Sequence, residues 1–248
     1  MPSEAPSQPE RFFFVHILKT GGVSLYVRMQ RHFGEEAVYP APSDGDPADV
    51  APQLFPHILL ERWRQRRDEI RVVTGHFPLC TIELLDADFR VMTVLRDPVD
   101  RTLSYLRHHR DITPADADRP LEEIYDDPAR FRPFIENHMV KMLSMKAAEM
   151  SNGMMTVIDL DRRRLRAAKR ALRKMDDFGL QEELEAFAGR LGRRYGWRLG
   201  PPVHENVTRP TEVPDSFRRR IAEDNRLDME LYEYGRRLAA RTARRAGP

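Results

Sequence analysis

Three short segments of the chain hold side chains that together could bind and transfer an anionic group. Lys19 lies in a Lys-Thr-Gly-Gly turn, His76 lies in a Gly-His-Phe turn, and Arg96 comes directly before an Asp-Pro pair. Ammonium and guanidinium groups bind phosphate-like oxygens, and an imidazole can take up a proton near neutral pH. These residue types therefore predict a site that holds an anion beside a base.

The Lys19 turn has the features of an anion-binding loop. An apolar stretch over 12–18 predicts a buried strand, and a helix is expected from about 22 to 32. Free backbone N–H groups at such a helix start point at a bound anion, and glycine lets the backbone approach it closely. Only five of the 41 basic residues are Lys, and Lys19 is the only one in the first 140 residues. The choice of Lys favours a chemical role, although an ordinary turn with a solvated Lys would have the same sequence.

The turn does not match the Walker A pattern of nucleotide-binding proteins. In that pattern a glycine comes directly before the Lys and a Ser or Thr directly after it. Here Lys19 precedes both glycines, and the hydroxyls of Thr20 and Ser24 lack the Walker context.

The segment over 94–110 supplies a second predicted anion contact. Arg96 is expected where a strand meets a loop, Asp97 suits a helix N-cap, and Pro98 suits the first helical position. Ser104 follows eight residues after Arg96, inside the helix. A guanidinium fork and a hydroxyl donor could therefore converge on one anion.

Strands and helices alternate along the chain, which predicts an α/β fold with a central, largely parallel sheet flanked by helices. Because ligands bind at the carboxyl ends of parallel strands, Lys19, His76 and Arg96 are expected at one sheet edge. The expected strands cover 12–18, 71–77, 89–96 and 154–160; the expected helices cover 22–32, 58–68, 98 onward, 134–150, 161–175, 181–195 and 216–241; loops are expected at 39–56 and 110–130.

Length and charge limit the possible organisation and partners. The 248 residues predict a disordered N-terminal lead at 1–10, one domain over 11–242 and a flexible basic tail at 243–248. The net charge of +2 argues against nucleic acid as a partner. Arginine runs at 162–164 and 218–220 lie among acidic residues and are expected to be solvated helix faces.

Cysteine content and hydropathy limit the expected compartment. Cys80 is the only cysteine, so an intramolecular disulfide and metal sites built from cysteine pairs are excluded. No apolar run approaches the ~20 residues that span a bilayer, so no transmembrane segment is expected. The N-terminal residues lack the basic and apolar regions of a signal peptide. These features predict a cytoplasmic protein.

The motifs resemble those of sulfotransferases that use 3′-phosphoadenosine 5′-phosphosulfate (PAPS). "FVHILKTGGVSL" is similar to their 5′-phosphosulfate loop, "LRDPVDRTLSYLRH" to their 3′-phosphate segment, and "GHF" at 75–77 to the segment with the catalytic histidine. All three occur in the family's order within 12–108, and 223–235 resembles the family's C-terminal helix. The most similar group contains heparan sulfate 2-O-sulfotransferases and many bacterial carbohydrate sulfotransferases. The resemblance implies the P-loop NTPase-like fold of that family.

The resemblance also implies a role for each matching residue. His76 would be the general base, and Lys19 would stabilise the leaving 5′-phosphate. Arg96 and Ser104 would hold the 3′-phosphate. The 5′-phosphosulfate would be held by Lys19, Thr20, Gly21, Gly22, Val23, Ser24 and Leu25. Leu18 stands where Pro is usual and Val23 where Thr is common, which removes a hydroxyl contact at position 23.

The activity implied by the resemblance is transfer of the sulfuryl group from PAPS to a hydroxyl of a small molecule or glycan, leaving 3′-phosphoadenosine 5′-phosphate (PAP). No metal is required in this scheme. The loops at 39–56 and 110–130 are expected to shape the acceptor site. Two other functions stay open: a nucleotide kinase or NTPase, which would depend on Mg²⁺, and a non-catalytic PAP-binding module.

Five further residues have weaker claims to the site. His16 is expected to be a packed core histidine, and His108 and His109 are expected at the surface after the phosphate helix. Arg101 would either add to the anion field or pair within its own helix. Arg209 would reach the nucleotide.

Overall fold

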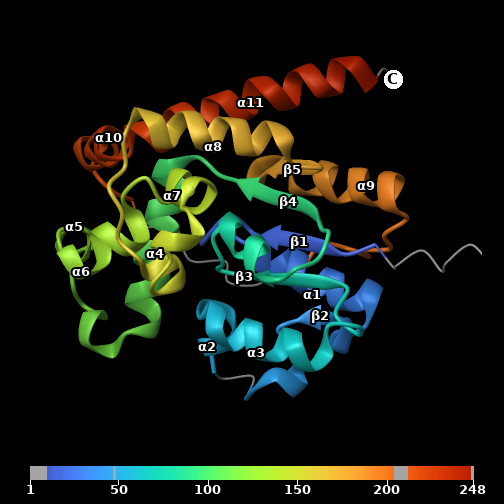
Figure 1. The fold of residues 1–248 in the computed structure, drawn as a ribbon. Coiled ribbons are helices and arrows are strands. Elements are labelled where there is room, and N and C mark those ends of the chain that lie inside the picture. Colours follow the sequence, from blue (N-terminus) through green and yellow to red (C-terminus); the bar gives the residue numbers. More distant parts are fainter. Residues whose placement is uncertain (1–9, 47–48, 204–211, 247–248) are drawn as a thin grey trace, which may run out of the picture.

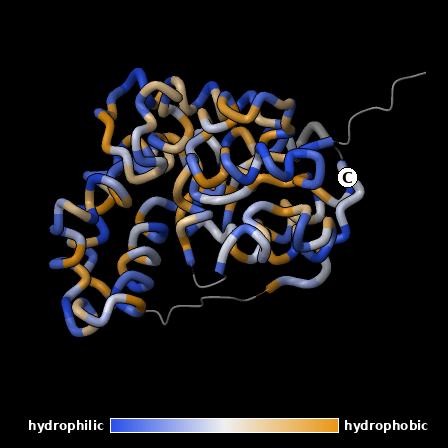
Figure 2. The backbone as a smooth tube through the Cα atoms, turned by 60° about the horizontal axis from the view of Figure 1, so that its bottom comes forward, coloured by the Kyte–Doolittle hydropathy of each residue, from blue (hydrophilic) through white to orange (hydrophobic). Residues whose placement is uncertain are grey.

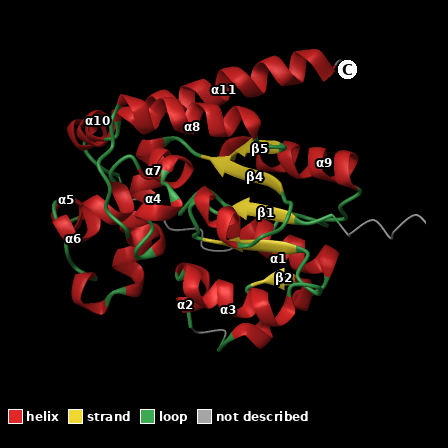
Figure 3. Cartoon of the chain, in the orientation of Figure 1, coloured by secondary structure: helices red, strands yellow, loops and turns green. Residues whose placement is uncertain are grey.

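The computed structural model describes residues 10–46, 49–203 and 212–246. Five parallel strands form one sheet in the order β2-β3-β1-β4-β5, and helices surround it (Figures 1 and 3). The strands are β1 (Phe12–Val15), β2 (Val38–Tyr39), β3 (Val72–Gly75), β4 (Arg90–Leu95) and β5 (Asp177–Leu180). The helices are α1 (Gly22–Phe33), α2 (Ala51–Leu54), α3 (Pro56–Arg66), α4 (Pro98–Ile112), α5 (Leu121–Tyr125), α6 (Pro128–Arg130), α7 (His138–Ser144), α8 (Arg162–Lys174), α9 (Leu184–Tyr195), α10 (Asp215–Asp224) and α11 (Arg226–Ala246).

The alternation of side chains along β1 divides the core into two parts. Phe13 and Val15 join a buried cluster with side chains from α3, α7, α8 and α11. Phe12 and Phe14 join a second cluster with side chains from α1 and α9. Because both faces of β1 are covered, its sequence is continuously apolar, as is typical of a central parallel strand. Figure 2 shows hydrophobic segments of the backbone toward the centre of the molecule, with hydrophilic ones between them.

A smaller apolar cluster holds the region next to the sheet edge. It contains Val99, Leu103 and Leu106 of α4 together with residues of α5 and α10. This cluster fixes α4 at the carboxyl ends of the strands, where the candidate site lies (Figure 1).

The α/β fold class predicted from the sequence is confirmed. The expected helix after the Lys19 turn is α1, and α4 begins at Pro98 with the Asp97 side chain accepting bonds from the backbone N–H groups of Val99 and Asp100. The predicted lead lies outside the described residues except for Glu10, whereas the first four residues of the predicted tail belong to α11, which continues to Ala246.

Two secondary-structure predictions are wrong. No strand covers 154–160, where a 3₁₀ turn at Gly153–Met155 leads into an extended segment with Val157 exposed. The fifth strand is instead β5, in a segment predicted only to separate two helices. It pairs in register with Met92–Leu95, so tertiary contacts decide its structure.

Two further segments differ from prediction in extent. The helix expected over 134–150 is reduced to α7, preceded by a π-helical turn at Phe131–Ile135. The loop expected over 39–56 contains the short helix α2 in its described part.

Candidate active site

The candidate site lies where the order of the strands changes direction. From β1 the chain continues to β2 on one side of the sheet, whereas from β4 it continues to β5 on the other side. The crevice at the carboxyl ends of two such neighbouring strands is the usual ligand site of open α/β sheets. Lys19 follows β1, Arg96 follows β4, and His76 follows β3 on the far side of β1. The three segments found in the sequence therefore meet at one edge.

The turn after β1 has a backbone conformation that its glycines permit. Lys19 has φ of 65° and Gly21 has φ of 88°, both in the left-handed region. The hydroxyl of Thr20 donates to the carbonyl of Ile17 at 2.8 Å, which closes the turn. A Cβ at Gly22 would lie 2.0 Å from Cδ2 of His16, so only glycine lets the His16 ring pack on the loop.

The N-terminus of α1 offers free donors to an anion. Its first-turn N–H groups have no intrahelical acceptor, no side chain caps them, and its first turn contains no acidic residue. The N-terminus of α4 differs, because the carboxylate of Asp97 already occupies it. Of these two helix starts at the sheet edge, only that of α1 is open to an anionic ligand.

Lys19 is a partly buried cation without a partner. Its ammonium makes no hydrogen bond or ion pair with any residue that the structure describes. Burial and, to a smaller extent, Arg96 lower the pKa of Lys19 to about 8, and Asp111 partly opposes this. The charged form of Lys19 is disfavoured in the free protein. A bound anion would stabilise that charged form and raise the pKa of Lys19.

The Arg96 side chain contacts the backbone of the Lys19 turn. Its Nη1 donates to the carbonyl of Lys19 at 3.1 Å, and its Nε is buried without a partner among the described residues. Burial lowers the pKa of Arg96. Ser104 is buried on α4, two turns beyond the Asp97 cap. Arg96 thus contacts the Lys19 turn, whereas the convergence of Arg96 and Ser104 on one anion stays a prediction.

His76 is held in one orientation and one tautomer. Its Nδ1 lies 2.8 Å from the carbonyl oxygen of His16, which can only accept, so Nδ1 carries the proton and Nε2 carries a lone pair. The backbone N–H of His76 donates to the carbonyl of Gln53 at 2.7 Å. Burial lowers the pKa of His76 to about 4, and Lys19 contributes. The ring is therefore neutral at physiological pH and can accept a proton.

The remaining loop residues differ in what they present. Val23 is 37% exposed, consistent with an outward position in which its missing hydroxyl has little cost. Leu25 is buried in the core, so only its backbone N–H is available to a ligand. Ser24 is half-buried at the second residue after Gly22.

Several weaker candidates have structural partners. His109 is buried and bonds Asp116 at 2.7 Å, so the prediction of a surface group is wrong for it, because the turn after α4 folds back over it. Arg101 is fully buried, and its terminal nitrogens donate to the carbonyls of Phe134 and Ile135. Arg209 lies outside the described residues.

His16 and His108 lie closer to the site than expected. The rings of His16 and His76 are 4.4 Å apart between centroids, and His16 is buried. Half-buried His108 has its pKa lowered by burial and by Lys19. The single sequence signal for His16 was its place three residues before Lys19, which also suits a core position.

The wall of the site contains two further neighbours that the sequence did not indicate. Leu184 and Gln181 lie 3.4 and 3.5 Å from the position of a Cβ at Gly21. Both follow β5, which the sequence did not predict as a strand, so their approach to the loop was not foreseeable.

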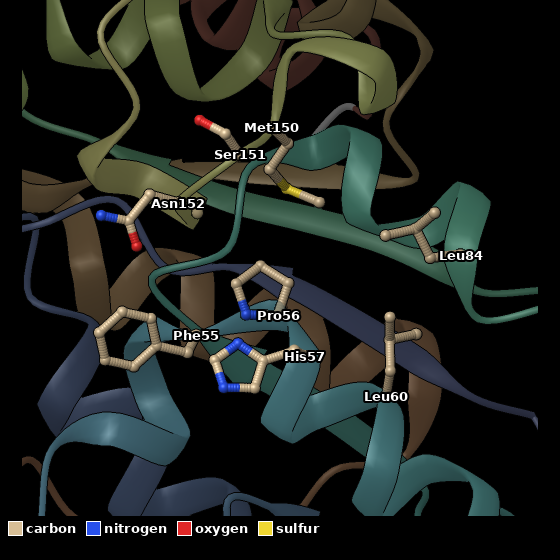
Figure 4. Close-up of a pocket in the computed structure, with 9 residues that line it drawn as sticks. Phe55, Pro56, His57, Leu60, Leu84, Met150, Ser151 and Asn152 are labelled. Carbon is tan, nitrogen blue, oxygen red and sulfur yellow. The ribbon is translucent and has the colours of Figure 1, made fainter.

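A cavity of about 190 Å³ lies next to the elements that hold His76. Figure 4 shows Met150 and Asn152 on one side of it, opposite Phe55 and Pro56. Phe55 of its lining comes two residues after Gln53, whose carbonyl accepts a hydrogen bond from the backbone N–H of His76. An aromatic ring with amide and hydroxyl groups suits a polar ligand that has apolar faces.

The described ranges contain neither a cluster of metal ligands nor a helix that could span a membrane. There, no group of three or more His, Cys, Asp or Glu side chains could hold a metal ion. No helix in these ranges has the length and apolar character needed to cross a bilayer.

Comparisons with known proteins agree with the motifs. The chain is 27% identical to heparan-sulfate 6-O-sulfotransferase 1 of Homo sapiens over 271 aligned positions, which cover 91% of this chain and 64% of that protein. The chain thus spans less than two thirds of that relative. The crystal structure of a sulfotransferase from Alicyclobacillus acidocaldarius superposes with a TM-score of 0.46 at 18% identity, covering 89% of this chain and 96% of that one. No protein-family model matches the chain.

Together with the three motifs, the similarity over nine-tenths of the chain supports a sulfotransferase family for this protein. The relative is named for 6-O-sulfation, whereas the motifs were matched to the 2-O group, so the similarity does not select the position sulfated.

Proposed function

We propose that this protein transfers the sulfuryl group of PAPS to an acceptor hydroxyl. One observation carries the proposal: the free ammonium of Lys19, the partner-free Nε of Arg96 and the open N-terminus of α1 meet at one edge of the sheet. Buried cationic donors that lack protein partners are costly unless a ligand completes them. PAPS carries anionic groups at its 5′ and 3′ positions, which match two such sets of donors.

His76 supplies the base in this proposal. The acceptor oxygen forms a bond to sulfur while the bond from sulfur to the 5′-phosphate oxygen breaks. The acceptor proton passes to Nε2 of His76, and PAP leaves with the developing negative charge. Lys19 and the first-turn N–H groups of α1 would stabilise that charge.

The low pKa of His76 is compatible with this role. In the free protein Lys19 and burial hold it at about 4. Bound anionic PAPS would offset the field of Lys19 and Arg96 and raise the pKa of His76 toward the range useful for a general base. The His16 carbonyl stabilises the imidazolium that forms, because it accepts a hydrogen bond from Nδ1–H both before and after Nε2 is protonated.

The acceptor in this proposal is a carbohydrate hydroxyl. The relative from Homo sapiens is named for action on heparan sulfate. The cavity described above combines the Phe55 ring with His57, Ser151 and Asn152, a composition suited to the apolar face and hydroxyls of a sugar.

The experiment that separates this proposal from a kinase or NTPase is a thermal-shift assay. PAP with EDTA should raise the melting temperature by mass action, whereas ATP with Mg²⁺ should not. A shift with Mg-ATP and none with PAP would contradict the proposal. A PAP shift without PAPS turnover on a panel of glycans that includes heparan sulfate would instead favour a non-catalytic PAP-binding module.

A further inference from the structure

Helix α8 carries an unusual concentration of positive charge. Its 13 residues include eight Arg or Lys and no Asp or Glu, in a chain whose net charge is only +2. Every exposed residue of the helix is basic. Five of these side chains make up what we term the α8 basic face: Arg163, Arg166, Arg170, Arg173 and Lys174.

The α8 basic face is a continuous stripe. At 3.6 residues per turn its members fall within an arc of about 100°, and they extend for roughly 17 Å along the helix. The opposite side of α8 is buried in the core through Leu165, Ala168 and Leu172. The fold therefore fixes the helix with its basic face outward.

Most members of this face have no counter-charge among the described residues. The side chains of Arg166, Arg170, Arg173 and Lys174 make no ion pair or hydrogen bond with any part of the chain that the structure describes. The other basic residues of α8 do have partners: Arg162 and Lys169 contact Glu230, and Arg164 contacts Glu149.

Another arginine run in the same protein behaves differently. In α10, Arg218 pairs with Asp100 at 2.8 Å, and Arg220 pairs with Asp126. Two of those three arginines thus have a carboxylate partner, whereas four of the five members of the α8 basic face have none among the described residues. The difference shows that this chain places carboxylates opposite arginines elsewhere on its surface.

Helix stability does not explain the α8 basic face. Arg162, Arg163 and Arg164 occupy the first turn, where the helix dipole disfavours positive charge. The Asp161 cap and the carboxylates of Glu230 and Glu149 offset the charge of this turn, but they lie away from Arg166 and Arg170. Basic residues in the last turn, Arg173 and Lys174, are favourable, but Arg166 and Arg170 lie in the middle. Binding of an external anion therefore explains the stripe better than helix stability does.

The stripe begins on the side of the molecule that holds the site. The C-terminus of α8 leads to β5 through Asp176, whose N–H binds the carbonyl of Val91 near the start of β4. The C-terminus thus lies at the sheet edge opposite the site, and the N-terminus with Arg163 lies toward the site edge (Figure 1).

We propose that the α8 basic face binds a linear anionic polysaccharide outside the active site. This proposal rests on the proposed function only in taking that polysaccharide to be the acceptor chain. Arginine binds sulfate and carboxylate groups with paired N–H donors, and a line of them matches a chain with repeated charges. A membrane is disfavoured, because no exposed apolar side chain accompanies the basic ones on α8.

The test compares two variants of the full chain with equal loss of charge. One carries Arg166→Gln, Arg170→Gln and Arg173→Gln. The matched control carries Arg31→Gln, Arg64→Gln and Arg67→Gln, which are exposed and lie in or next to α1 and α3. The readouts are the affinity for heparin as the polyanion probe at two salt concentrations, the affinity for PAP, and binding to phosphatidylcholine vesicles with and without phosphatidylserine.

The first variant should bind heparin about tenfold more weakly than wild type and with a smaller salt dependence, because three exposed contacts are lost. The control should bind heparin as wild type does, and both should bind PAP normally. Equal loss in both variants, or no heparin binding by wild type, would overturn the α8 proposal while leaving the PAP site intact. Capture by phosphatidylserine vesicles without heparin binding would also overturn it, in favour of a membrane.

Discussion

Lys19 is a partly buried lysine and Lys141 a fully buried one, and the difference between them separates a structural cation from a candidate functional one. Burial lowers the pKa of Lys141 to about 7, below the value of about 8 for Lys19. Yet the Lys141 ammonium donates to the carbonyls of Pro133 and Met154, both at 2.6 Å. The larger shift in pKa belongs to Lys141, so the pKa alone would point to Lys141 as the functional lysine. Lys19 is the better candidate, because its ammonium has no partner among the described residues.

The surroundings of Lys141 explain its role. Nearby Asp228 is fully buried, and its carboxylate accepts the N–H groups of Met139 and Val140 at the start of α7. Burial raises the pKa of Asp228 to about 6. This network joins α7 to α11, and Lys141, which is 1% exposed, is out of reach of a ligand.

The N-termini of α1 and α4 differ in the same way, here in whether their backbone N–H groups have a partner. Asp97 fills the N-terminus of α4 with a carboxylate from the chain itself, whereas Gly21 leaves that of α1 open. In both comparisons the candidate site is where the protein omits a partner that it supplies elsewhere.

The largest expected effect is on turnover. His76→Ala should lower the rate of sulfuryl transfer from PAPS by ~10²–10⁴-fold, because a positioned general base is lost. PAP affinity and melting temperature should stay near wild type. Transfer at the wild-type rate would show that another group is the base, and joint loss of stability and PAP binding would make His76 structural.

The two lysines should respond in opposite ways to substitution by Met. Lys141→Met should lower the free energy of unfolding by about 2–4 kcal/mol, since two buried carbonyls lose their donor. Lys19→Met should keep or raise the melting temperature and remove most PAP binding. The comparison fails if Lys19→Met is the less stable variant in chemical denaturation.

A smaller effect is expected from pH on PAP binding. The pKa of Lys19 is about 8 in the free protein, and a bound anion would raise it. Affinity should therefore be constant below pH 8 and fall by up to tenfold per pH unit above it, as Lys19 loses its proton. The PAP phosphates are already ionised in that range. Lys19→Arg is the matched control, because arginine stays charged and should bind PAP without this decline.

The sequence was sufficient to predict that the candidate residues lie at one edge of the sheet. Lys19, His76 and Arg96 each follow an apolar stretch, and parallel strands necessarily end at the same edge. Asp97 and Pro98 marked the start of α4 through local capping, which depends on neighbouring residues alone.

Features that depend on tertiary contacts could not be predicted in the same way. β5 has only four residues, one of them Gly179, and its pairing with β4 makes it a strand. His109 is buried because Asp116 returns to it across a turn. Lys141 lies in a segment with a helical pattern, and nothing in that pattern indicates that carbonyls at 133 and 154 would enclose its ammonium.

The most direct test of the central claim is calorimetric titration of wild type and Arg96→Ala with PAP and with adenosine 5′-phosphosulfate, in EDTA. The second ligand lacks the 3′-phosphate that Arg96 is proposed to bind. We predict that Arg96→Ala weakens PAP by about 1.5–3 kcal/mol, the cost of a charge-assisted contact, and leaves adenosine 5′-phosphosulfate nearly unchanged. Equal losses for both ligands, or no PAP binding by wild type, would contradict the assignment of the partner-free cations to the two ends of PAPS.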